Sequence, residues 1–277
     1  MSDATTSFNA IVPWAEGRNR SAVTSEPCGS ATPVLAINLA RSSRRVIHLQ
    51  AEMDAAGLPL QRLIATDGAT MPDAMRARHY SDTLNRQSYH KPLLNGEIGC
   101  YISHLRAWQW LLDSGFEHAI ILEDDVTLGA TFCDALSALS RLPMAWDIIK
   151  LGSLSPKPVL DSVNLGQFSL RRYRKTPISA FAQAISRRGA EKLLRTRTNF
   201  GRPVDVDIQY CWEAGLEIYG LEPYPVRIRQ DVPSDISRIA ERDIIRRRRI
   251  TFLRQRLQFV FRQIQANRNW SGWPQPA

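Results

Sequence analysis

The sequence lacks several features that would assign the chain to particular classes of protein. No segment reaches the run of about 18 apolar residues that a membrane-spanning helix requires. Residues 1–31 show no apolar period and are rich in Ser, Thr, Ala and Asn, so we expect a disordered arm. They also lack the basic start and apolar stretch of a secretory signal. The four cysteines show no spacing typical of a zinc or redox motif, and scattered single cysteines fit a reducing cytosol. We therefore expect a cytoplasmic protein.

What is present is ordinary for a globular protein. The chain has 277 residues, of which 44% are hydrophobic and 23% are charged, so it can bury a sizeable core. We expect residues 32–235 to form one domain, and we find no internal repeat.

The positive charge is concentrated near the C-terminus. The formal net charge is +9, and ten arginines lie between Arg238 and Arg268 against only Glu241 and Asp243. An apolar stripe at helical spacing runs through the same segment, formed by Ile250, Leu253, Leu257, Val260, Phe261 and Ile264. Residues 236–277 therefore predict a basic amphipathic helix and tail, which suits an anionic membrane surface. A helix packed on the domain and a nucleic-acid-binding segment are the alternatives, and we expect nucleic acid to be the weaker of them.

Apolar runs and helical periods alternate through the first 150 residues, which favours an α/β fold with a mostly parallel sheet flanked by helices. The expected strands are 34–39, 60–65, 119–122, 146–151, 168–174, 178–185 and 216–221. The expected helices are 42–56, 95–115, 131–142, 186–194 and 204–214, with Ser42 and Ser186 as caps. Residues 69–92 predict loops or short helices, and residues 153–166 predict a long loop.

A buried strand that ends in three carboxylates is the most informative motif. Glu123, Asp124 and Asp125 follow an apolar run, and side chains alternate along a strand, so Glu123 and Asp125 would face the same way. Two such carboxylates can share a hard cation such as Mg²⁺ or Mn²⁺. Asn38 ends a second strand, and ligands of such sheets bind beyond the carboxyl ends of the strands. A solvated acidic turn is the plainer interpretation.

Several motifs together resemble glycosyltransferase family 25, the family of lipopolysaccharide and lipooligosaccharide glycosyltransferases. The most specific matches are residues 96–105, from Gly96-Glu97 to His104-Leu105, followed by Trp108, and the acidic triplet after Ile121-Leu122. Weaker matches, in the family's order, are Ala36-Ile37-Asn38-Leu39, Arg44-Arg45, Asp67-Gly68, residues 185–190 with Leu193-Leu194, and Pro203-Val204-Asp205. The resemblance covers about residues 33–230.

The resemblance implies a GT-A-like fold with a single Rossmann-like domain that binds a nucleotide-sugar. It also implies a metal-dependent, inverting hexosyltransferase that uses a UDP-hexose donor, commonly UDP-galactose. The implied acceptor is a saccharide, usually lipid-linked, so the enzyme would work on the inner face of the cytoplasmic membrane. The long N-terminal arm and the arginine-rich end depart from the family pattern and leave the acceptor open.

The site residues can be assigned provisional roles within this chemistry. We expect Glu123 and Asp125 to hold Mn²⁺ or Mg²⁺, with Asp124 as an alternate ligand or a contact to ribose or sugar. An inverting transfer needs a base, and a carboxylate suits this role. Asp205 and Asp207 are the main candidates, although Asp205 would also suit a helix cap. Glu97 would contact donor or acceptor, or stabilise a helix start, and His104 is a rival base or a structural residue.

The nucleotide would be bound near the end of the first strand. Asn38, Arg41, Arg44 and Arg45 follow that strand, and arginine pairs with phosphate or stacks on uracil. Arg44 and Arg45 would equally suit a solvated helix face. Three other functions stay open from the sequence: an inactive glycan- or nucleotide-binding module, a nucleic-acid-binding protein and a metal-dependent phosphohydrolase.

Overall fold

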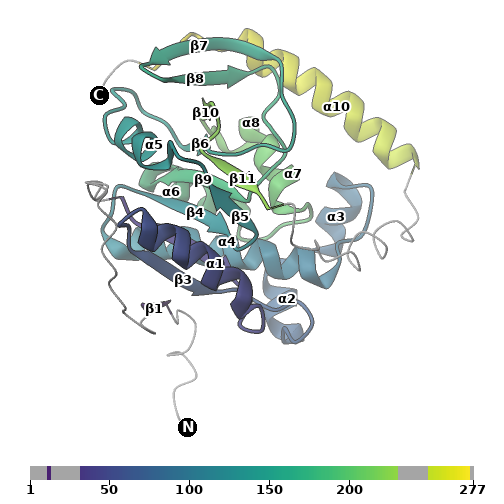
Figure 1. Ribbon diagram of the computed structural model, residues 1–277. Coiled ribbons are helices and arrows are strands. Elements are labelled where there is room, and N and C mark those ends of the chain that lie inside the picture. The colour runs from purple at the N-terminus through teal and green to yellow at the C-terminus, as the bar shows by residue number, and fades with distance from the viewer. Residues whose placement is uncertain (1–10, 14–31, 230–248, 275–277) are drawn as a thin grey trace.

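The computed structural model describes residues 11–13, 32–229 and 249–274. In these ranges the centre of the molecule is a nine-stranded sheet with the order β1-β3-β2-β4-β9-β6-β10-β8-β7 (Figure 1). Its strands are β1 (Ile11–Pro13), β2 (Val34–Asn38), β3 (Leu60–Ile64), β4 (His118–Glu123), β6 (Ile148–Lys150), β7 (Val159–Leu165), β8 (Phe168–Tyr173), β9 (Ala182–Ser186) and β10 (Ile218–Glu222). A separate antiparallel ribbon pairs β5 (Val126–Leu128) with β11 (Val226–Ile228).

The sheet is mixed, which corrects the expectation of a mostly parallel one. Strand β2 runs parallel to both β3 and β4, and β6 runs parallel to β10. Strand β9 lies between β4 and β6 and is antiparallel to both, and β1, β7 and β8 also pair antiparallel. The parallel part that carries Asn38 and Glu123 is as predicted, so their strand ends do meet at one edge.

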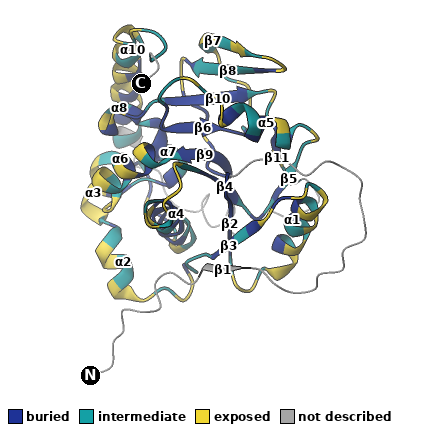
Figure 2. Ribbon diagram, turned by 90° about the vertical axis from the view of Figure 1, so that its left-hand side faces the viewer, coloured by how far each residue is buried: buried dark blue, intermediate teal, exposed yellow. Residues whose placement is uncertain are grey.

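Helices cover both faces of this sheet (Figure 2). Side chains alternate along β4, so Ile121 joins one core while Ile120 and Leu122 join the other. The first core packs under α4 (Asn95–Ser114), α6 (Arg187–Arg197), α7 (Val204–Gln209) and α8 (Cys211–Ala214), and the second under α1 (Ser43–Ala55) and α5 (Phe132–Leu139). The other helices are α2 (Asp73–His79), α3 (Asp82–Ser88) and α10 (Arg249–Arg268).

Helix α4 brings the glycine-rich motif to the sheet edge. Its apolar stripe, including Ile98, Ile102 and Trp108, is fully buried in the first core, as its period predicts. Gly115 ends the helix with a φ of 78°, a left-handed conformation that glycine adopts without strain. A Cβ at Gly99 would lie 2.5 Å from the carbonyl oxygen of Thr66, so glycine lets the helix start pack closely on the loop after β3.

Most predicted elements are confirmed within two to four residues, and three predictions are wrong. Residues 153–166 contain the strand β7 rather than only loop, the helix expected over 204–214 breaks at Tyr210 into α7 and α8, and Ser42 makes no side-chain capping bond. Ser186 does cap α6, because its side chain accepts a hydrogen bond from the Gly189 amide. Of the expected arm, residues 11–13 form β1, whereas residues 1–10 and 14–31 lie outside the described residues. Residues 230–248, which include the first part of the basic tail, also lie outside them.

Candidate functional site

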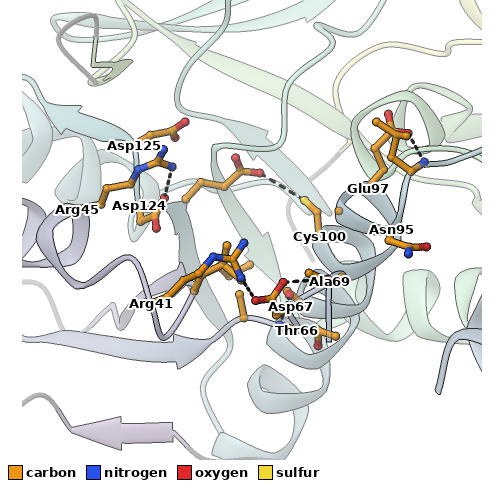
Figure 3. A pocket seen from close by; sticks show the side chains of 18 of the residues that line it. Arg41, Arg45, Thr66, Asp67, Ala69, Asn95, Glu97, Cys100, Asp124 and Asp125 are labelled. Atoms are coloured by element: carbon orange, nitrogen blue, oxygen red, sulfur yellow. Dashed lines mark hydrogen bonds and ion pairs between the residues drawn. The ribbon is translucent and has the colours of Figure 1, made fainter. Parts of the chain in front are cut away.

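A pocket of about 620 Å³ lies beyond the carboxyl ends of β2, β3 and β4 (Figure 3). The start of α4 forms one wall, and the turn between β4 and β5 forms another. The lining residues are Ile37, Leu39, Arg41, Arg45, Ala65, Thr66, Asp67, Gly68, Ala69, Leu93, Leu94, Asn95, Gly96, Glu97, Cys100, Ser103, Glu123, Asp124 and Asp125. The acidic triplet, the glycine-glutamate motif and two of the arginines therefore share one cavity.

Asp124 is held in place from behind the pocket wall. The Asn38 side-chain amide donates to Asp124 Oδ2 over 2.5 Å, and Arg45 lies 3.5 Å from Asp124 Oδ1. The buried Arg62 guanidinium donates to Asn38 Oδ1, which fixes the orientation of the amide. Asn38 itself is buried and does not line the pocket, so its observed contacts are with Asp124 rather than with the cavity.

Glu123 faces a different set of neighbours across the floor of the pocket. Its Oε1 atom lies 3.9 Å from the Cys100 thiol, and Cys100 Sγ lies 3.8 Å from His104 Nδ1. One ligand atom from each of these three residues lies within 4.8 Å of the other two. His104 is fully buried, and burial lowers its pKa, so a neutral imidazole is favoured. It has no exposed surface and is not among the residues that line the pocket.

The start of α4 supplies the remaining polar groups of the pocket. Glu97 lines it, and its Oε2 atom accepts a hydrogen bond from the Leu94 amide over 2.9 Å. This contact is the helix-start role that the sequence offered as one of two alternatives. Across the cavity Arg41 forms an ion pair with Asp67, and both side chains are partly exposed. Arg44, in contrast, is exposed and does not line the pocket.

Asp205 and Asp207 do not line this pocket, and the two residues differ. Asp207 is buried and accepts from the Tyr101 hydroxyl over 2.6 Å and from Arg202 over 2.8 Å, with Arg197 at 3.3 Å. These contacts join α4, α6 and α7. Asp205 is half-buried at the start of α7, and its Oδ1 atom accepts from the backbone amide of Val206.

Lys150 connects Asp205 electrostatically to the acidic triplet. The side chain is fully buried at the end of β6, and desolvation lowers its pKa to about 7. Asp205 and then Glu123 oppose that shift, so both carboxylates are near enough for their charges to act on the same ammonium group. Its nitrogen donates to the Ser179 carbonyl at 2.5 Å and to Gln183 Oε1 at 3.1 Å.

Several pocket residues were not singled out from the sequence. Cys100 and Asp67 occur in motifs that resemble the family, but the motifs assign neither residue a role. Their spacing does carry a signal, since Cys100 follows Glu97 by one helical turn and so shares its face. Arg62, which lies behind the pocket and orients Asn38, gave no signal, because burial of a polar side chain within a strand depends on the tertiary fold.

Carboxylates and arginines around one strand-end cavity suit a ligand that carries phosphates and a divalent cation. The chain belongs to glycosyltransferase family 25, described as an LPS biosynthesis protein family, whose model matches residues 31–208.

Curated relatives are similar over parts of the chain. A Danio rerio procollagen galactosyltransferase 1 is 27% identical over 174 residues, which cover 58% of this chain and 28% of the relative. The Neisseria gonorrhoeae lacto-N-neotetraose biosynthesis glycosyltransferase LgtB is 32% identical over 93 residues, 34% of this chain and 32% of the relative. A Mus musculus protein named inactive glycosyltransferase 25 family member 3 is 26% identical over 215 residues, 69% of this chain and 36% of the relative. The chain thus spans about a third of each of these relatives.

Proposed function

We propose that the chain transfers a hexose, with galactose as the first candidate, from a UDP-sugar to a saccharide acceptor with inversion at the anomeric carbon. The observation that carries this proposal is the cavity that gathers Glu97, Arg41, Arg45 and the acidic triplet in a member of this family. Relatives named as galactosyltransferases support galactose as the sugar. We further propose that residues 32–235 are the catalytic domain and that the mixed sheet is a variant of the GT-A fold.

The pocket suits a nucleotide diphosphate in volume and charge. A cavity of about 620 Å³ is within the range of about 300–1,000 Å³ that small-ligand sites commonly occupy. Arg41 and Arg45 on its wall can pair with phosphate oxygens or stack on the base. Asn38 supports the site indirectly by orienting Asp124, and Arg44 would act through long-range attraction, given its exposure.

The donor set of the acidic turn fits a hard divalent cation. Asn38 and Arg45 hold Asp124, and all three carboxylates line the cavity. We assign Glu123 and Asp125 as ligands of Mn²⁺ or Mg²⁺, with Asp124 in a supporting position. Bound there, the cation would neutralise charge on the leaving diphosphate. The contact with Arg45 would keep the Asp124 carboxylate beside the arginines that we propose for nucleotide binding.

The base must take the proton from the acceptor hydroxyl, and the contacts favour one candidate. Asp207 already accepts from Tyr101 and two arginines in the interior, which supports a structural role. Asp205 is partly exposed, and its charge reaches Lys150 together with that of Glu123, so we propose Asp205 as the base. Glu97 is the second candidate because it lines the cavity, although it also receives the Leu94 amide.

The acceptor is assigned from the family description and from LgtB. We propose a lipid-linked saccharide of a surface glycan, which would place the reaction at the inner face of the cytoplasmic membrane.

A donor panel tests the proposal. UDP-galactose, UDP-glucose and GDP-sugars are assayed with and without Mn²⁺ for release of the nucleotide diphosphate and for transfer to a panel of saccharide acceptors. We expect metal-dependent turnover with a UDP-hexose, and we expect Asp205→Asn to lower kcat far more than it raises KM. Release of sugar phosphate without a glycosylated product would indicate a phosphohydrolase instead.

A second function is favoured by one comparison. The relatives named as inactive members match a larger share of this chain than LgtB does, so a binding module of the same fold is the alternative. It predicts a rise in melting temperature with UDP-sugar and Mn²⁺ in the absence of any turnover.

A further inference from the structure

Helix α10 is anchored to the body of the protein through one face only. Phe259 on that face packs against the rings of Tyr210 and Trp212, with centroids 5.0 and 5.2 Å apart. Gln255 donates to the Gln87 carbonyl at the end of α3, and Asn267 donates to the Arg174 carbonyl after β8. These contacts are spread over more than three turns of the helix and hold it against the same side of the molecule as α3 and α8 (Figures 1 and 2).

The opposite face of α10 is apolar and points to solvent. Among the described residues it carries five of the large hydrophobic side chains that are exposed. They are Leu253, Leu257, Val260, Phe261 and Ile264, which are 60%, 72%, 48%, 66% and 47% exposed. They follow the three- and four-residue spacing of one helical stripe, which we call the outer stripe. The inward face buries Phe259 together with two glutamines, Gln255 and Gln263, so most of the large apolar side chains of this helix lie on its solvent side.

Positive charge surrounds the outer stripe. Arg254 and Arg256 lie on its two sides, Arg268 continues its line at the end of the helix, and all three are exposed. The sequence contains no Asp or Glu after Asp243. The stripe is apolar along its centre, and the charged side chains at its edges are all cationic. Such a surface is complementary to a partner that has an apolar interior beneath an anionic surface.

We propose that the outer stripe of α10 docks the protein on an anionic lipid bilayer. The helix would lie in the plane of the interface, with the five apolar side chains among the acyl chains near the headgroups and the arginines at the level of the lipid phosphates. Because the inward face is tied to the body, docking requires no unfolding of the helix. The docking surface is carried by residues outside the match to the family model, which ends at residue 208.

A second copy of the chain is a less suitable occupant. The spacing of Leu253, Leu257, Val260 and Ile264 would also suit a coiled-coil seam, but the charged residues beside that seam are then Arg254, Arg256 and Arg268. Pairing two such helices would bring like charges together with no acidic partner in the segment. Nucleic acid would satisfy the arginines but leave the apolar side chains without a role.

Vesicle flotation of the full chain tests this proposal. The probes are vesicles of phosphatidylcholine alone and of phosphatidylcholine with phosphatidylglycerol. The stripe variant is Leu257→Glu with Phe261→Glu, and the matched control is Gln258→Glu with Gln265→Glu, two exposed positions off the stripe with the same change in charge. We expect the wild-type chain to float with anionic vesicles, more weakly at high salt. We expect the stripe variant to bind anionic vesicles at least roughly tenfold more weakly than the wild-type chain. The control variant should lose much less affinity for the same vesicles.

Each other result would overturn the proposal. An equal loss of vesicle binding in both variants would mean that binding depends on net charge alone. If the wild-type chain did not float with anionic vesicles, a lipid bilayer would be excluded as the partner. A stable dimer that the stripe variant converts to monomer, without lipid binding, would assign the face to a second copy. Duplex DNA binding without lipid binding would assign it to nucleic acid.

The proposal stands on the geometry of α10 and is independent of the transferase chemistry. Turnover with a soluble acceptor is therefore measured on the same variants. Loss of turnover with intact flotation would count against the proposed function alone, and loss of flotation with intact turnover would count against docking alone.

Discussion

Helices α4 and α10 have the same length, 20 residues, and they place their apolar stripes in opposite environments. In α4 the stripe that includes Ile98 and Trp108 is fully buried under the sheet, whereas in α10 Leu257 and Phe261 project into solvent. The hydrophobic period predicts both stripes equally well. The period shows that a face is apolar, but the surrounding fold decides what covers it.

None of the helices in the described ranges has the length and hydropathy to cross a bilayer.

The largest expected difference between α4 and α10 is in how much their apolar side chains contribute to the free energy of unfolding. Trp108 has no exposed surface and packs against the rings of Tyr101 and His104. We expect Trp108→Ala to lower the free energy of unfolding by about 3–5 kcal/mol, because it leaves a cavity in the first core. Chemical denaturation followed by circular dichroism measures this. A loss below about 1 kcal/mol would mean that α4 is not the buried helix described here.

A buried cation and the exposed arginines of α10 should differ in their response to pH. Lys150 has a folded pKa of about 7 against an ordinary value of 10.5, because burial disfavours its charged form. Between these values the unfolded chain binds a proton that the folded chain does not, so stability falls as pH decreases from 10.5 to 7. Relative to Lys150→Met, the wild-type chain should lose on the order of 5 kcal/mol across that window.

Denaturation midpoints of both proteins at several pH values check this expectation. Arg254→Met serves as the control, since it replaces an exposed cation and leaves the interior unchanged. A difference between wild type and Lys150→Met that stays constant with pH would contradict the burial of a cation at this position.

An interior polar contact of α4 gives a smaller effect. The Tyr101 hydroxyl donates to the buried carboxylate of Asp207, which keeps two arginine partners when that hydroxyl is removed. We expect Tyr101→Phe to cost about 1–2 kcal/mol of stability without changing the secondary structure. Thermal unfolding would show this, and an unchanged melting temperature would argue against the Tyr101–Asp207 hydrogen bond.

The smallest effect on stability should come from the outer stripe. Leu257 is 72% exposed, so Leu257→Ala removes few protein contacts and should change the free energy of unfolding by less than about 0.5 kcal/mol. The same denaturation assay measures it. A loss comparable to that of Trp108→Ala would show that the stripe is covered by protein.

Sequence patterns predicted those elements that are set by local residues. The bounds of α1, the start and end of α4 and the capping of α6 by Ser186 all follow from period and turn chemistry. The meeting of Glu123 with the end of β2 followed from the parallel pairing of β2 and β4.

Features that depend on distant segments were not predictable from local patterns. An apolar run does not reveal strand direction, so the antiparallel insertion of β9 between β4 and β6 was missed. Strand β7 was hidden by neighbouring Pro and Gly residues and by its exposed polar positions at the sheet edge. The interior network of Asp207 arises from α4, α6 and the loop before α7, which converge only in the folded chain.

The central claim is that the carboxylates beyond β4 hold a divalent cation against the diphosphate of a UDP-sugar. The most direct measurement is Mn²⁺-dependent transfer from a UDP-hexose by the wild-type chain and by Asp125→Ala, with the melting temperature recorded for both. The account predicts that transfer disappears in the variant while its melting temperature stays within a few degrees of the wild-type value. Undiminished transfer by a folded Asp125→Ala protein would contradict it.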